Sequence, residues 1–100
     1  MYGRTGKIIA QPGQRDALVK VLLRAAEALG EAEGCYLYVV GQVPDETDMI
    51  WITEVWRSAA DHRASLDLEA IQALIRDGRP LIASMTESYE VIPVGGKGLP

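Results

Sequence analysis

The stretch ITEVWRSAADH, residues 52–62, holds the side chains of this chain that are best suited to chemistry. His62 is the only histidine, and because its ordinary pKa lies near neutrality it is the default group to accept a proton from a substrate. Trp56 carries an indole that can stack on an aromatic ring or donate its Nε1–H to an oxygen. His62 and Trp56 are therefore candidate catalytic residues. The alternative is that His62 is an exposed helix residue and that Trp56 closes one end of the core.

Two further polar residues are candidates for binding a substrate. Tyr38 could donate a hydrogen bond to a substrate oxygen, or it could be a core tyrosine. Glu54 shares a strand face with Trp56 because side chains alternate along a strand. If that face is buried, the carboxylate needs a partner, such as Arg57, Arg63 or a backbone donor. A structural ion pair is the expected role of Glu54.

Composition excludes several classes of function. The chain has 100 residues, enough for one domain. Its net charge is −4 and no two basic residues are adjacent, so the basic footprint that nucleic-acid binding needs is missing. One cysteine, Cys35, and one histidine cannot form an internal disulfide or a structural zinc site. No apolar run reaches the roughly 18 residues of a membrane helix, and no secretory signal is recognisable. We expect a cytoplasmic protein with no membrane partner.

The first half of the chain predicts a strand, a helix and a hairpin. Residues 7–11 form a β-branched run that Pro12-Gly13 ends. Residues 14–31 predict a helix, since their apolar side chains recur on one face (Leu18, Val21, Leu22, Ala25 and Leu29). Residues 35–43 and 49–57 predict two strands joined by an acidic turn at 44–48. Alternation along the second strand of the hairpin places a mainly apolar set on one face (Ile50, Ile52, Glu54 and Trp56).

The second half predicts two helices and a last strand. Ser58 can cap a helix that carries His62, with Asp61 three residues on. Residues 67–78 predict an amphipathic helix, and Pro80 prevents its continuation. Residues 81–85 are expected to form a turn. Residues 86–94 predict a strand, at a sheet edge or ending near Pro93, and 95–100 form a flexible tail.

The order of these elements is βαββαβ, which is typical of a ferredoxin-like α+β sandwich. We therefore expect a single domain over residues 1–94. Helices would cover only one face of an antiparallel sheet, and the apolar residues of the other face must be hidden. Packing of two sheet faces in a homodimer is the simplest solution.

Four segments carry a resemblance to a known family: AQPGQRDAL, GCYLY, ITEVWRSAADHRASL and RPLIAS. In this order and spacing they resemble the antibiotic biosynthesis monooxygenase domain, a family of dimeric α/β-barrel proteins that includes quinol monooxygenases. The resemblance covers nearly the whole chain. It implies a homodimer joined through its sheet faces, and a pocket between sheet and helices. It also implies oxidation of a small, hydroquinone-like aromatic substrate by O₂ with no metal, flavin or other cofactor.

The chain departs from this family at Ser65, where relatives commonly carry a second histidine. Ser65 is kept as a candidate substrate-binding residue beside Tyr38 and Glu54, and haem degradation is disfavoured because no iron-ligating histidine is present unless His62 substitutes. The leading hypothesis is a cofactor-independent monooxygenase in which His62 assists deprotonation while Trp56 and Tyr38 orient the ring. The alternatives are an isomerase or detoxifying enzyme for a small carbonyl metabolite, or a non-catalytic dimer that binds a small ligand.

Overall fold

A computed structural model describes residues 1–100. Four strands and three α-helices follow one another as β1 (Tyr2–Ala10), α1 (Arg15–Ala28), β2 (Cys35–Gln42), β3 (Met49–Trp56), α2 (Ala59–Ser65), α3 (Glu69–Gly78) and β4 (Ile82–Val91). Short 3₁₀ turns follow α1 at Leu29–Glu31 and α3 at Arg79–Leu81. The predicted βαββαβ order and α+β class are confirmed. None of the helices is long and apolar enough to cross a membrane.

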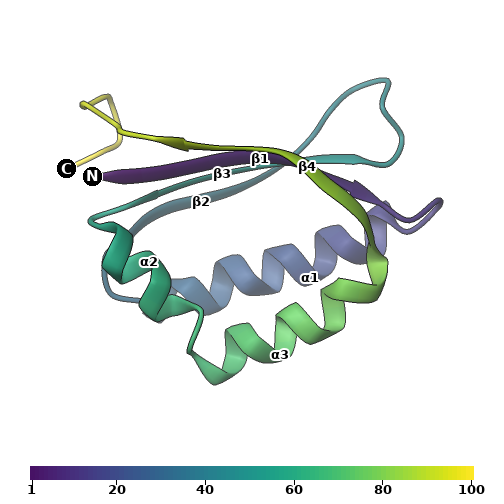
Figure 1. The fold of residues 1–100 in the computed structure, drawn as a ribbon, viewed down its shortest axis with the longest axis horizontal. Helices are drawn as coiled ribbons and strands as arrows, with labels where there is room; N and C mark the ends of the chain where they lie inside the picture. Colours follow the sequence, from purple (N-terminus) through teal and green to yellow (C-terminus); the bar gives the residue numbers. More distant parts are fainter.

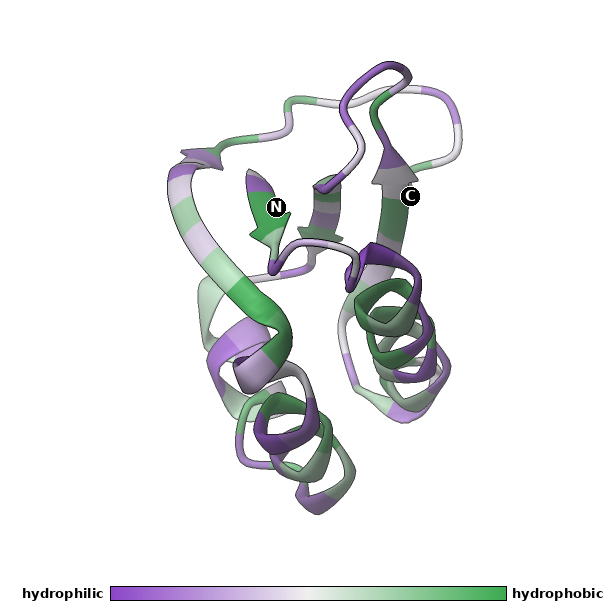
Figure 2. Ribbon diagram, turned by 90° about the vertical axis from the view of Figure 1, so that its right-hand side faces the viewer, coloured by the Kyte–Doolittle hydropathy of each residue, from purple (hydrophilic) through white to green (hydrophobic).

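The strands form one antiparallel sheet in the order β2-β3-β1-β4. All three helices lie on one face of this sheet, and both chain termini lie at the same end (Figure 1). The view turned by 90° shows the same arrangement, with the helices below the strands (Figure 2). This one-sided cover is the ferredoxin-like sandwich that the element order predicts.

The core lies between the helices and the inner face of the sheet. One cluster joins α1 to the middle of the sheet (Ile8, Ala10, Leu18, Ile50 and Ile52) and a second lies near α2 (Leu29, Trp56 and Ile71). Leu18 and Leu29 belong to the apolar stripe predicted for the first helix. Ile50, Ile52 and Trp56 are buried on one face of β3, as alternation along this strand predicted.

The first strand begins earlier than the sequence indicated, at Tyr2 rather than at residue 7. Gly3 and Gly6 hid the beginning of this strand, because glycine is depleted in strands. β1 is central, however, and it pairs with β3 on one side and β4 on the other. Two ladders of backbone hydrogen bonds outweigh the low strand propensity of its glycines, so pairing decides where the strand begins.

The last strand also begins earlier, so the turn predicted at 81–85 is wrong. Only Arg79–Leu81 forms a 3₁₀ turn, and β4 starts at Ile82, which pairs with Ala10. The register between β1 and β4 shifts twice, between Lys7 and Ile9 and between Ile9 and Ala10. Such irregularities bend a strand, and β4 curves down toward α3 in Figure 1. Pro93 follows the end of this edge strand, as predicted.

The outer face of the sheet is open in the single chain. Val39 is 52% exposed, Tyr89 58% and Val91 46%, and these three residues come from the two edge strands β2 and β4. In the middle of the same face, Trp51 donates its Nε1–H to Thr5 Oγ1 at 2.7 Å. Only 13 of the 100 residues are buried, so much of the apolar surface of this chain has no cover of its own.

Candidate active site

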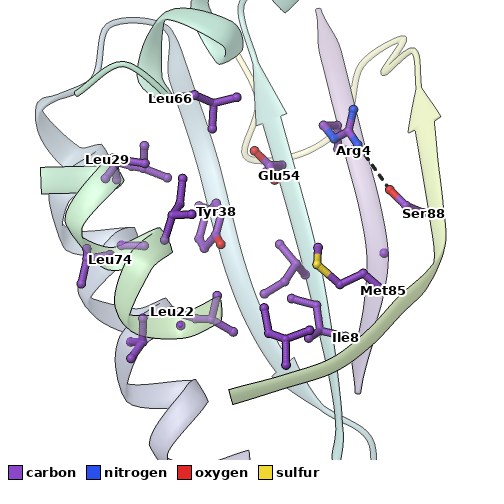
Figure 3. Close-up of a pocket in the computed structure, with 18 of the residues that line it drawn as sticks. Arg4, Ile8, Leu22, Leu29, Tyr38, Glu54, Leu66, Leu74, Met85 and Ser88 are labelled. Atoms are coloured by element: carbon purple, nitrogen blue, oxygen red, sulfur yellow. Dashed lines mark hydrogen bonds between the residues drawn. The ribbon is translucent and has the colours of Figure 1, made fainter. Parts of the chain in front are cut away.

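A cavity of about 530 Å³ lies between the inner face of the sheet and the helices. Of its 26 lining residues, 15 are hydrophobic, and such a mainly apolar site with a few polar groups is typical of small-molecule binding. One wall comes from α1 and the 3₁₀ turn after it (Leu18, Val21, Leu22, Ala25 and Leu29), and another from α3 (Ile71, Leu74 and Ile75). Figure 3 shows Ile8 and Met85 at one end, with Glu54 and Arg4 at the other.

The polar end is built from one row of side chains that crosses the whole sheet. Tyr38 pairs with Glu54, Glu54 with Arg4, and Arg4 with Glu90. The row therefore takes one residue from each of β2, β3, β1 and β4. Directly paired residues of antiparallel strands point to the same face, so the register of the sheet alone brings Tyr38, Glu54 and Arg4 together at the cavity, while Glu90 extends the row at the exposed edge strand.

His62 reaches this polar end from α2. Its ring lies between two aromatic rings, with the centroid of Tyr2 at 5.5 Å and that of Trp56 at 5.5 Å, the latter in an edge-to-face arrangement at 73°. Nε2 of His62 lies 3.5 Å from Oε1 of Glu54, and each of these two side chains is only 14% exposed. The predicted candidate base and the predicted carboxylate are thus neighbours in a partly buried site.

Burial sets the protonation state of His62. Desolvation, the largest cause, lowers the pKa of His62 below its ordinary value, and the positive charges of Arg4 and Arg63 act in the same direction. The carboxylate of Glu54 partly opposes this effect by favouring the imidazolium. The pKa of His62 is therefore lowered overall, so the imidazole is neutral at neutral pH and can accept a proton.

Glu54 has different partners from those that the sequence suggested. Its Oε1 accepts a hydrogen bond from Trp56 Nε1 at 2.8 Å and faces His62. Arg57 instead binds Asp61, with N···O distances of 2.6 and 3.0 Å, and Glu33 at 3.3 Å. Arg63 is exposed on α2. The expected partners Arg57 and Arg63 are therefore wrong, because alternation turns Glu54 inward while Arg57 follows the end of the strand and Arg63 is exposed.

The junction between β3 and α2 is anchored at several points, which fixes the position of His62. Ser58 Oγ accepts a hydrogen bond from the backbone N–H of Asp61 at 3.1 Å, as the predicted helix cap requires. The Asp61 carboxylate is held by Arg57, which keeps the pKa of Asp61 below its usual range. Gly34 lies against Asp61 with a φ of +82°, where a side chain would collide with the carboxylate. These contacts hold the first turn of α2, and with it His62, in place.

Tyr38 and Ser65 both line the cavity, with different capacities for binding. The Tyr38 ring reaches into the cavity from β2 (Figure 3). Burial and the nearby Glu54 charge raise the pKa of Tyr38 well above its usual value, so the hydroxyl keeps its proton and can donate it. Ser65 is buried, and its hydroxyl donates to the His62 carbonyl at 2.6 Å. Ser65 can therefore offer a ligand only its acceptor lone pairs.

Arg4 is the polar residue of the site that sequence reasoning missed. It lines the cavity beside Glu54, and its guanidinium donates to Tyr2 Oη at 2.9 Å and to Ser88 Oγ at 3.3 Å. The sequence did not indicate Arg4 because the first strand was predicted to begin only at residue 7. Once the strand is begun at Tyr2, alternation places Arg4 on the same face as the buried Ile8.

A family model described as antibiotic biosynthesis monooxygenase matches residues 1–77. The structure of a protein from Chloroflexus aurantiacus, whose name provisionally assigns it as an antibiotic biosynthesis monooxygenase, is 50% identical in sequence with a TM-score of 0.92. The alignment covers 99% of this chain and 98% of that one. No curated protein matches the chain.

More distant structures share the fold. A structure from Deinococcus radiodurans with the same provisional name is 21% identical, with a TM-score of 0.81 and coverage of 96% of this chain and 95% of that one. A protein from Pseudomonas aeruginosa is 19% identical, with a TM-score of 0.83 and coverage of 94% of each chain. At such identities the likeness supports the fold, and function has to be argued from the cavity.

Proposed function

Because the chain belongs to the antibiotic biosynthesis monooxygenase family, we propose that its cavity oxidises an electron-rich, hydroquinone-like aromatic substrate with O₂ and without a bound cofactor. The observation that carries the proposal is a neutral, partly buried His62 beside Glu54 at the polar end of an apolar cavity. Apolar walls suit an aromatic ring, and a base at one end suits its hydroxyl group.

Removal of the phenolic proton by His62 is the step for which this chain supplies the chemistry. The resulting phenolate is electron-rich enough to reduce O₂ itself. One oxygen atom enters the ring to give a hydroxyquinone, and the other leaves as water. Glu54 lies opposite the ring nitrogen of His62 and stabilises the imidazolium that forms. The N–H of Trp56 holds the carboxylate in place, while the protonated Tyr38 can donate to a substrate oxygen.

Oxygen consumption tests the reaction. With a panel of mono- and bicyclic hydroquinones, we expect uptake of one O₂ for each hydroxyquinone formed, above the rate of autoxidation without protein. An oxygen electrode together with mass spectrometry of the product after reaction under ¹⁸O₂ measures both quantities. Turnover of a carbonyl metabolite under anaerobic conditions would contradict the proposal in favour of an isomerase or detoxifying enzyme. Thermal stabilisation by ligands without any product would contradict it in favour of a binding protein.

We also propose that the chain forms a homodimer through the outer face of its sheet. The support is the exposure of Val39, Tyr89 and Val91 on this face, together with Ile92 and Val94 directly after β4, which are 80% and 97% exposed. A sheet face with this much apolar surface is costly to leave in water, and a second copy of the same face would cover it.

Light scattering checks the dimer. The wild type is expected to have twice the chain mass of 10.9 kDa at micromolar concentration. Val39→Asp introduces a charge that must be desolvated at the interface, so this variant should shift to the mass of one chain. Leu23→Asp is the matched control, since Leu23 is 50% exposed on a helix that lies on the opposite side. A monomeric wild type, or equal shifts in both variants, would contradict the sheet-face dimer.

A further inference from the structure

Arg4 is the cationic side chain at the polar end of the cavity, and the mechanism described so far does not use it. Its guanidinium is held by Tyr2 and Ser88, which lie on its own strand and on the neighbouring strand β4. These bonds engage two of the five N–H donors of a guanidinium. The side chain is thus fixed in place with donors to spare, which is the condition for binding an oxyanion.

Neither neighbouring carboxylate satisfies Arg4 on the cavity side. Glu54 is paired with Arg4 across the strands, but its Oε1 is engaged by the indole of Trp56 and lies next to His62. Glu90 is the acid within ion-pair distance, 3.6 Å from Nη1, and its side chain is 70% exposed. Water screens such an exposed pair and leaves it weak. The Arg4 side chain is itself 35% exposed, so the donors that Tyr2 and Ser88 do not engage are held by no strong protein partner and are open to a ligand at this end of the cavity.

The surroundings of Arg4 leave room for that partner. The next residue on the same face of β1 is Gly6, which lines the cavity and has no side chain to fill it. Beyond Gly6 the wall is apolar, with Ile8 and Ile52. In Figure 3, Arg4 and Glu54 stand side by side at the end of the cavity, and Ser88 supports Arg4 from β4. A ring in the apolar part would place an oxygen at this end.

We propose that Arg4 binds the ionised oxygen of the substrate, so that the cavity holds a phenol in its anionic form. The inference rests on the proposed function for its choice of ligand, and it adds an oxyanion-binding residue to that site. His62 removes the proton and Arg4 holds the charge that is left behind. The anion is stabilised where it forms, because the guanidinium is already oriented by Tyr2 and Ser88 before the substrate enters.

Binding of 4-nitrophenol tests this role without any turnover. Its ionised form is coloured and resists oxidation, and its methyl ether, 4-nitroanisole, is a neutral molecule of similar shape. At a pH at which free nitrophenol is mostly ionised, Arg4→Gln should weaken nitrophenolate binding by roughly ten- to hundredfold, as loss of a charge-assisted hydrogen bond implies. Binding of nitroanisole should change by less than about threefold, because this ligand is neutral and has no ionised oxygen for Arg4 to bind. Arg4→Lys should retain part of the preference for the anion.

Arg76→Gln is the matched control, because it removes the same charge from an exposed position of α3 and should leave both affinities unchanged. Equal weakening of both ligands in Arg4→Gln would mean that Arg4 only supports the cavity wall, and would overturn the proposal. Lack of nitrophenolate binding by the wild type would also overturn it. Arg4-dependent anion binding without oxygen uptake from any hydroquinone would leave the assignment of Arg4 standing and remove the monooxygenase activity.

Discussion

Replacing His62 by alanine is expected to lower kcat for oxygen consumption by roughly 10²- to 10⁴-fold, the usual contribution of a positioned general base. The change removes the neutral imidazole that faces Glu54 in the partly buried end of the cavity. Arg76→Ala is the control, since Arg76 is an exposed residue of another helix, α3, and does not line the cavity. Full activity in His62→Ala would contradict the role of this residue as the base.

The pH dependence of the rate should identify the same group. Activity requires the neutral imidazole, so kcat/KM should fall as the pH drops through the pKa of His62. Because burial lowers this pKa, the acid limb should lie below the ordinary histidine value of about 6.5. Glu54→Gln removes the charge that raises the pKa of His62, and should move the limb to still lower pH while reducing the plateau. An acid limb that stays in place in Glu54→Gln would contradict the coupling of these two residues.

Truncating Trp56 to alanine is expected to lower the free energy of unfolding by about 3–5 kcal/mol, the usual cost of removing a large buried aromatic side chain. Trp56 is fully buried and packs with Leu29 and Ile71. Urea denaturation followed by circular dichroism measures this loss. A loss below about 1 kcal/mol would mean that the surrounding core closes over the vacated space.

The Trp56→Phe variant separates packing from chemistry. Phenylalanine refills most of the volume but cannot donate the hydrogen bond that Glu54 Oε1 receives at 2.8 Å. Oxygen uptake should therefore fall in Trp56→Phe by more than its loss of stability explains. Trp51→Phe is the matched control, since it also removes one indole donor, in this case the bond to Thr5 on the outer face. Equal activities in the two variants would show that Trp56 only fills the core.

The sequence predicted the fold closely where local patterns and final structure agree. The hairpin strands, the buried face of β3 and the Ser58 cap of α2 all follow from residue spacing and from short-range hydrogen bonding. The first and last strands were predicted less well. The start of β1 depends on pairing between Gly3 and Val91, 88 positions apart, and the start of β4 on pairing between Ala10 and Ile82, 72 positions apart. No local pattern reports such pairing.

The candidate site was predicted only in part, because local patterns place neighbouring residues but do not report the pairing of distant strands. Trp56, His62 and Glu54 lie within nine residues of one another, so strand alternation and a helix start were enough to place them at one junction. Arg4 joins them only through the register of β1 against β3. The partner of Glu54 was also missed, because alternation places Trp56 on the same strand face as Glu54 without indicating a hydrogen bond between the two side chains.

The row formed by Tyr38, Glu54, Arg4 and Glu90, of which the first three line the cavity, makes the polar end of the cavity depend on strand alignment. Each strand contributes one member, and a slip of one residue in any strand would turn its member to the outer face. A misaligned chain would then lose a charge or a donor from the cavity, together with the apolar side chains that the same strand contributes to the core. Binding of an anion at this end would consequently favour the correctly aligned sheet over its slipped alternatives, so the ligand would act as a selector of the native pairing.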